Sequence, residues 1–169
     1  MNFLALDFET ANYYRDSACA LGLVRVENNK IIEKESLLIR PPYKWFVFTY
    51  LHGISWEDVE NVPTFKQHWK SIKPFFKGID FAVAHNASFD KGVLHACCER
   101  HGINVPDVDF QCTMKLSRRV FGLYPTNLPA VCDKFDISLH HHDALSDTMA
   151  CAKIMIKILK ESKSNYEFL

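Results

Sequence analysis

The chain has 169 residues, of which 48% are hydrophobic and 13% aromatic, and its 20 basic residues balance 20 acidic ones. This composition excludes a disordered chain and suffices for one domain with a sizeable core, which we expect over residues 1–169. The balanced charge removes the global positive field of a nonspecific nucleic-acid binder. It still permits a local basic rim around an acidic, metal-filled centre.

The six cysteines form no C-x-x-C pair; they are Cys19, Cys97, Cys98, Cys112, Cys132 and Cys151. Because the N-terminus does not resemble a secretion signal, we expect buried, reduced thiols in a cytoplasmic protein, with a zinc site as the alternative. No apolar stretch reaches the ~18 residues of a membrane span, so we expect no membrane partner.

The first third of the chain predicts three strands. Apolar residues over 2–8 indicate a buried strand, and residues 19–26 and 31–39 follow as two further strands. The two asparagines of the turn between the latter strands tolerate left-handed backbone angles, so we expect an antiparallel meander. Residues 43–54 are aromatic and irregular.

Capping patterns and alternation predict the remaining elements. Ser55 begins a short helix, and Thr64, with a glutamine three residues later, opens a helix over 64–77 that Pro74 kinks or ends early. The remaining strands are expected over 80–85 and 108–112, and the remaining helices over 88–101, 115–121, 128–135 and 144–160. A meander followed by alternating helices and strands predicts a mixed α/β sheet with helices outside.

The first chemical signal is the sequence Asp7-Phe8-Glu9-Thr10 at the end of the first strand. Side chains alternate along a strand, so Asp7 and Glu9 point the same way. Two adjacent carboxylates at the end of a buried strand need a proton or a counter-charge, which a divalent ion with oxygen ligands supplies. The alternative is a solvated strand end without function.

The second signal is Asp90, in the first turn of the helix that follows the fourth strand. The helix dipole favours an ionised acid there, which suits a metal ligand. Alone, the residue is better explained as a mere complement to that dipole. A cap or turn likewise explains Asn86, and the end of the strand explains His85.

The third signal is the segment 140–147, where three histidines stand beside two acids. Residues five apart on a helix differ by about 140°. His142 and Asp147 therefore converge only if His142 lies in a loop and the helix begins near residue 143 or 144. Asp143 is then a candidate N-cap.

Together these segments offer four carboxylates from three elements and one histidine that titrates near neutrality: Asp7, Glu9, Asp90, Asp147 and His142. Such a set suits two magnesium or manganese ions about 3.5–4 Å apart, which clamp an in-line phosphoryl displacement. Neutral His142 would take the proton of the attacking water.

The three segments resemble the DnaQ-like (DEDDh) 3′–5′ exonucleases of the ribonuclease-H-like superfamily, including the epsilon-subunit-like exonucleases of DNA polymerase III. The matching motifs are Asp-x-Glu-Thr at 7–10, His-Asn-Ala-x-Phe-Asp at 85–90 and His-x-Ala-x-x-Asp at 142–147. Each motif is weak alone, but three in this order at these spacings are highly specific. Secondary features at 52–54, 63–65 and 112–113 extend the resemblance over nearly the whole chain.

The resemblance implies a five-stranded sheet of three antiparallel and two parallel strands, and it assigns the metal ligands. It makes Asp7 the bridge between two ions, lets Glu9 and Asp147 complete the ligation, and has Asp90 act mainly through water. His142 is the implied general base.

The same resemblance implies a pocket for the 3′-terminal nucleotide, formed by Thr10, Ala11, Asn12 and Asn86. Many relatives carry Thr-Gly after the second acid, whereas this chain has Ala11-Asn12. The wedge against the penultimate base is therefore unassigned. His140 and His141 are out of register with the motif and are expected to be structural or exposed.

Two further groups of residues, one basic and one aromatic, each have two possible roles. Lys115, Arg118 and Arg119 could hold phosphates or merely form a solubilising rim. The aromatic residues of 43–50 could stack on single-stranded bases, or fold onto the core or a dimer partner.

We therefore expect a metal-dependent 3′–5′ exonuclease that releases nucleoside 5′-monophosphates from single-stranded DNA. RNA ends are the alternative substrate, because nothing in the sequence reads a 2′-hydroxyl. A polymerase-associated subunit would carry a partner-binding tail, for which the stretch after Asp147 leaves little room. A non-catalytic nucleic-acid module predicts the loss of an acid, and none is missing. The oligomeric state is left open.

Overall fold

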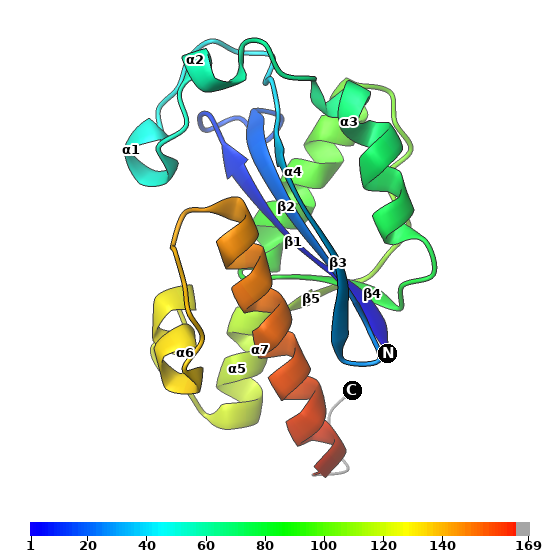
Figure 1. The fold of residues 1–169 in the computed structure, drawn as a ribbon, viewed down its shortest axis with the longest axis vertical. Coiled ribbons are helices and arrows are strands. Elements are labelled where there is room, and N and C mark those ends of the chain that lie inside the picture. The colour runs from blue at the N-terminus through cyan, green and yellow to red at the C-terminus, as the bar shows by residue number, and fades with distance from the viewer. Residues whose placement is uncertain (165–169) are drawn as a thin grey trace.

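The computed structural model describes residues 1–164, and a five-stranded sheet in the order β3-β2-β1-β4-β5 lies at its centre (Figure 1). The strands are β1 (Asn2–Thr10), β2 (Ala18–Glu27), β3 (Lys30–Leu38), β4 (Phe81–Ala84) and β5 (Phe110–Cys112). β1, β2 and β3 pair antiparallel, whereas β1–β4 and β4–β5 pair parallel. The predicted mixed sheet is confirmed.

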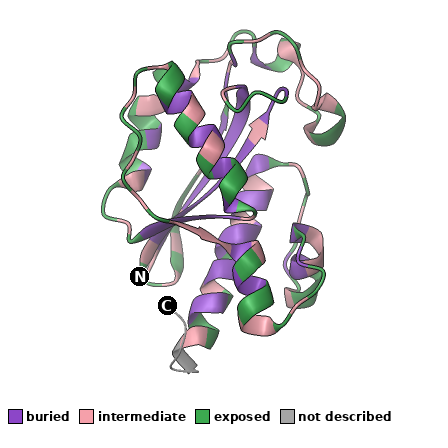
Figure 2. Ribbon diagram, turned by 180° about the vertical axis from the view of Figure 1, so that it is seen from behind, coloured by how far each residue is buried: buried purple, intermediate pink, exposed green. Residues whose placement is uncertain are grey.

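Helices cover both faces of this sheet. They are α1 (Thr49–His52), α2 (Trp56–Val59), α3 (Phe65–Ile72), the 3-10 helix η1 (Lys73–Phe76), α4 (Ala87–Arg100), α5 (Thr113–Phe121), α6 (Leu128–Phe135) and α7 (Ala144–Ser164). Figure 1 shows α7 in front of the sheet and α4 behind it, and Figure 2 shows buried residues along the strands between them. Within residues 1–164, no helix has the length and apolarity that a membrane crossing requires.

The alternation along β1 divides the core into two clusters. Phe3 and Ala5 pack with α7, α5 and α6, whereas Leu4 and Leu6 pack with α3 and α4. Asp7 and Glu9 continue the row of Phe3 and Ala5, so their side chains face the α7 side of the sheet. The strand geometry thus brings the two acids to the same helix that carries Asp147.

Several element boundaries differ from the sequence prediction; α5 begins two residues earlier, at Thr113, and α7 extends four residues further, to Ser164. A single helical turn, α1, lies within 43–54, which we expected to be irregular. The helix expected over 64–77 ends at Ile72 and continues as η1, because Pro74 lacks the amide that an α-helix needs. The strand expected over 108–112 is shorter, since the edge strand β5 pairs only with the short β4.

Gly22 of β2 permits an unusually close approach of α7 to the sheet. It pairs with Asp7 across the β1–β2 ladder. A Cβ atom at Gly22 would lie 2.2 Å from the carbonyl oxygen of Ala144 and 2.3 Å from Oγ1 of Thr148. The first turns of α7 therefore pack directly onto the β2 backbone at the level of Asp7. This packing brings Asp147 close to Asp7.

We expect Gly22→Ala to destabilise the protein by about 1–3 kcal/mol, because the added methyl overpacks a backbone contact. This exceeds the ~0.5–1 kcal/mol that alanine gains over glycine in a regular element. Urea denaturation measures the difference. Ser36→Ala, at the exposed neighbour of Gly22 on β3, is the matched control and should change stability by less than about 0.5 kcal/mol. A Gly22→Ala protein as stable as the wild type would contradict the close approach.

Candidate active site

Three elements place four acids at one edge of the sheet. Asp7 and Glu9 end β1, and Asp90 lies in the first turn of α4, directly after β4. Because β1 and β4 run parallel, their carboxyl ends meet at the same edge. Asp147 lies in the first turn of α7, which packs on the face of the sheet toward which Asp7 and Glu9 point.

The carboxylate oxygens of Asp7, Glu9 and Asp147 offer ligand atoms that all lie within 4.8 Å of one another. Asp90 lies beside them, 1% exposed, and its Oδ1 accepts a hydrogen bond from the backbone amide of Phe8 at 3.0 Å. This bond ties the start of α4 to the β1 peptide between the two acids. The structure therefore brings together the four carboxylates that the motifs singled out.

The acids raise one another's affinity for protons. Burial, followed by the charges of Asp90, Glu9 and Asp147, raises the pKa of Asp7 well above its ordinary value. Burial, followed by the charges of Asp147, Asp90 and Asp143, raises the pKa of Glu9 to about 8, and burial raises the pKa of Asp90 to about 7. Such a cluster is stable only with protons or with cations between the carboxylates.

The donor set fits divalent cations. Carboxylate oxygens are the ligands that magnesium and manganese prefer. Asp147 is 4% exposed, yet its Oδ1 has no hydrogen-bond partner within the described residues. A buried carboxylate oxygen without a donor is costly unless a ligand satisfies it. Asp7, Glu9 and Asp147 are thus the residues that could hold metal, with Asp90 behind them.

Two histidines meet at Asp147. Nδ1 of His141 lies 2.8 Å from Asp147 Oδ2, and the backbone amide of His142 donates to the same oxygen at 3.2 Å. The two imidazole rings stack with centroids 3.9 Å apart. The resemblance excluded His141, so sequence reasoning missed its contact with the acid. The run of three histidines was the only available signal.

His142 lies in a left-handed turn with φ of 68°, immediately before α7. Asp143 caps that helix, since its Oδ1 accepts a hydrogen bond from the amide of Ser146 at 2.7 Å. The helix start and cap are those predicted from the sequence. Burial and the adjacent His141 lower the pKa of His142, so its imidazole is neutral near pH 7.

The predicted pocket residues differ in accessibility. Asn86 is exposed in a left-handed conformation, whereas Thr10 is buried, and its backbone oxygen accepts a contact from His52 Nε2. Ala11 and Asn12 are 0% and 1% exposed. Their assignment to the nucleotide pocket stays a prediction, but their burial favours a role within the protein.

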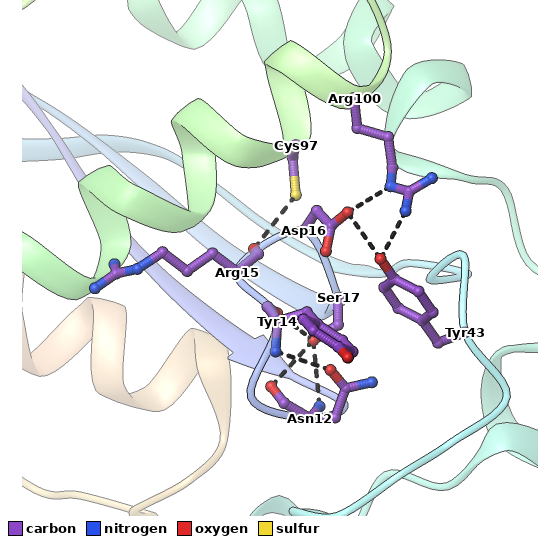
Figure 3. A network of polar contacts seen from close by, with 8 residues as sticks. All are labelled: Asn12, Tyr14, Arg15, Asp16, Ser17, Tyr43, Cys97 and Arg100. Carbon is purple, nitrogen blue, oxygen red and sulfur yellow. Dashed lines mark hydrogen bonds and ion pairs between the residues drawn. The ribbon is translucent and has the colours of Figure 1, made fainter.

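Asn12 is engaged on both sides of its amide. Its Nδ2 donates to the backbone oxygen of Trp45 at 2.9 Å, and its Oδ1 accepts from the amide of Tyr14 at 2.9 Å (Figure 3 shows Asn12 and Tyr14). Its own amide donates to Ser17 Oγ. Asn12 therefore holds the loop after β1 to the aromatic segment before α1.

His52 makes a second tie between the same segments. Its Nδ1 accepts from the amide of Ile54 at 3.1 Å, so the Nε2 proton is free to donate to the Thr10 oxygen at 3.1 Å. Burial lowers the pKa of His52, in agreement with this neutral tautomer. The segment His52-Gly53-Ile54 thus supports the end of β1.

The comparisons with known proteins agree with this geometry. The model of the exonuclease family RNase_T matches residues 4–155. The PolC-type DNA polymerase III of Caldanaerobacter subterraneus subsp. tengcongensis is 30% identical over 165 residues, and that of Bacillus subtilis is 29% identical over 170. The alignments cover 94% and 95% of this chain but only 12% of each polymerase.

Solved structures are similar over almost the whole chain. Exonuclease X in complex with 5′ overhanging duplex DNA is 26% identical, with a TM-score of 0.75 over 95% of this chain and 93% of that one. The nuclease domain of 3′hExo, a DEDDh family member bound to rAMP, is 17% identical with a TM-score of 0.81, over 95% and 92%; this likeness concerns the fold. The chain belongs to the exonuclease family, in its DEDDh group within the ribonuclease-H-like superfamily.

The raised pKa values predict how stability depends on pH. The folded state holds protons that the unfolded state releases near pH 4, so without divalent ions stability falls as pH rises toward the pKa of Glu9, about 8. The histidines with lowered pKa values oppose this fall only while the unfolded state still loses their protons, near pH 6.5, and they add little above about pH 7.5.

We therefore expect the melting temperature of the ion-free protein to fall by about 3 °C or more between roughly pH 6.5 and 8.5. Magnesium or manganese should reverse the fall by binding the folded carboxylates. Asp7→Asn, which removes one charge, should flatten the ion-free profile. A melting temperature that is constant over this range, with and without ions, would show that the acids are not under mutual repulsion.

Proposed function

We propose that this chain is a metal-dependent 3′–5′ exonuclease that cleaves the terminal phosphodiester of single-stranded DNA and releases nucleoside 5′-monophosphates. The observation that carries the proposal is the group of carboxylates from β1 and α7, of which Asp7 and Glu9 are half-buried and Asp147 is buried, close enough to share ions. Membership of the exonuclease family supplies the reaction class. Divalent cations explain how an acidic centre can act on a polyanionic substrate, because the ions lie between the carboxylates and the phosphate.

Two magnesium or manganese ions, held by Asp7, Glu9 and Asp147 with Asp90 reaching them through water, would supply the activated water and the charge that stabilises the leaving oxygen. The protein's own contribution is to hold these carboxylates rigidly. The Phe8 amide fixes Asp90, and the antiparallel ladder with β2, in which Asp7 pairs with Gly22 and Glu9 with Ala20, fixes the other two.

His142 is the proposed general base. Its lowered pKa keeps a ring nitrogen available to accept the proton of the attacking water near neutral pH. The residue lies in a left-handed turn, and its amide donates to Asp147 Oδ2, which supports this assignment. His141 occupies the same carboxylate oxygen through its ring, so it competes with ligation at Asp147 and does not substitute for His142.

We propose that Thr10 and Asn86 border the 3′-terminal nucleotide, while Ala11 and Asn12 shape the loop beside it. Lys115 is exposed on α5 and lies with Lys91 at a hollow of about 340 Å³ next to the start of α4. It is the better candidate for a phosphate contact, because Arg118 already donates to Thr126 Oγ1 at 2.9 Å.

The relatives favour DNA over RNA. The PolC-type relatives are DNA polymerases, and exonuclease X is seen with duplex DNA. The structure bound to rAMP is too distant in sequence to indicate a substrate. Because the chain spans 12% of the PolC-type polymerases, association with a polymerase as a proofreading component is the second candidate function.

We expect Asp7→Asn to lower hydrolysis by at least about 10³-fold, because the loss of a shared ligand removes several kcal/mol of transition-state stabilisation. Asp143→Asn is the matched control: it removes a nearby acid but keeps an equally good N-cap, so activity should remain within a few-fold. The assay offers 5′-labelled DNA and RNA, single and duplex, with magnesium or manganese.

Product lengths separate the possible activities in this assay. A ladder that shortens one nucleotide at a time from the 3′ end is expected, fastest on single-stranded DNA. Internal cuts would indicate an endonuclease, and near-normal activity of Asp7→Asn would disprove the assigned centre.

We expect His142→Ala to lower kcat by about 10²–10⁴-fold, the usual contribution of a general base. His141→Ala should retain most activity and need less magnesium for half-maximal rate, because its ring no longer competes for Asp147. Titration of magnesium against rate measures both. If His141→Ala lost more activity than His142→Ala, the two roles would have to be exchanged.

A further inference from the structure

An exposed group of aromatic rings lies beside the candidate active site and has no role in the chemistry described above. It is formed by two segments, the loop after β1 and the stretch before α1, and we call it the aromatic platform: Tyr13, Tyr14, Tyr43, Trp45 and Phe48. Tyr13, Tyr14 and Trp45 are 72%, 55% and 53% exposed. Exposed apolar residues gathered in this way usually mark an interaction site.

The rings form a continuous surface. The Tyr13 ring lies 6.2 Å from Trp45 and meets Phe48 edge-on at 5.0 Å. The Tyr14 ring lies 6.2 Å from Trp45 and 5.2 Å from Tyr43. The exposed faces of the central rings, Tyr13, Tyr14 and Trp45, thus belong to one surface and not to scattered positions.

Polar contacts hold the platform in place. Asn12 joins the Trp45 and Tyr14 backbones, and the Ala11 oxygen accepts from the amide of Val47 at 2.7 Å. At the far end, Asp16 and Arg100 both bind the Tyr43 hydroxyl, as Figure 3 shows. The rings are therefore preorganised, and a ligand need not order them.

The platform is continuous with the catalytic edge of the sheet. Tyr13 follows Thr10 by three residues, so their Cα atoms lie at most about 11 Å apart. His52 ties the second segment to the same Thr10 backbone. A strand whose 3′ end reached Glu9 and Thr10 would pass over these rings within its next few nucleotides.

We propose that the aromatic platform stacks the bases of an unpaired strand just upstream of the 3′-terminal nucleotide. Aromatic rings bind single strands without reading sequence, because every base offers a π-face. A paired strand fits poorly, since its base faces are covered by their neighbours in the stack. This inference rests on the proposed function and deepens it: several unpaired nucleotides, and not only the last one, are bound.

The test measures binding separately from hydrolysis. A 5′-fluorescein 12-nucleotide DNA is titrated with the Asp7→Asn protein in magnesium, which keeps the probe intact, and anisotropy reports binding. A second probe lacks the bases at positions two to four from the 3′ end, and a third lacks three bases at the 5′ end. We expect the 3′-abasic probe to bind about tenfold more weakly, and the 5′-abasic probe to bind like the intact one.

Variants then locate the effect. Tyr13→Ala and Trp45→Ala, each added to the Asp7→Asn protein, should bind the intact probe about as weakly as the Asp7→Asn protein binds the 3′-abasic probe. These variants should no longer distinguish the intact probe from the 3′-abasic one. Tyr13→Phe and Trp45→Phe keep a ring and should restore most of the discrimination. Tyr124→Ala, at a tyrosine that is 85% exposed on the loop between α5 and α6, is the control and should bind normally.

Equal binding of the intact and 3′-abasic probes by the Asp7→Asn protein would overturn the proposal, whatever the alanine variants do, and would assign the rings to a protein contact. This outcome is distinct from failure of the proposed function. In that case, the wild-type protein with Tyr13 and Trp45 intact would show no metal-dependent hydrolysis, even if the bases were stacked.

Discussion

The first turns of α7 lie against the sheet at the level of Asp7 only because Gly22 has no side chain. That approach brings Asp147 from one end of the chain to Asp7 and Glu9 at the other. It is also a packing constraint, since Ala144 and Thr148 occupy the space that any larger residue would need. A single missing side chain in β2 therefore controls the geometry of residues on two other elements.

Electrostatic repulsion and desolvation oppose this gathering of acids. Each acid that reaches this edge of the sheet is desolvated, which raises the pKa of Asp7, Glu9 and Asp90, and the charges of neighbouring acids raise the pKa values of Asp7 and Glu9 further. The remaining core, with its two apolar clusters, must outweigh that repulsion when no cation is bound. The contact of His141 with Asp147 is one local compensation, because the imidazole holds Oδ2 of a carboxylate whose Oδ1 has no hydrogen-bond partner within the described residues.

Much of this arrangement follows from the sequence. Alternation along β1 predicts the shared face of Asp7 and Glu9, and the capping residue Asp143 predicts where α7 begins. The sequence could not reveal the roles of residues whose partners are distant in the chain. A lone glycine in the apolar strand 19–26 is a signal of close backbone approach, but nothing local identifies α7 as the approaching element. His141 was set aside because a motif records spacing, whereas a ring stacked in a turn can reach the same carboxylate from either of two adjacent positions.

The contacts of Asn12 explain why this chain has Ala11-Asn12 where many relatives have Thr-Gly. Asn12 is large enough to span from the loop after β1 to the Trp45 backbone, and it is buried because that contact closes over it. A glycine there would leave both ends of this bridge unsatisfied and the aromatic segment untied. The residue that sequence comparison would place against the nucleotide instead holds Tyr13, Tyr14 and Trp45 in position. In the proposed complex, the rings that contact the strand therefore lie further from the reacting phosphate than Asn12 does. Their position depends on the same end of β1 that holds the carboxylates.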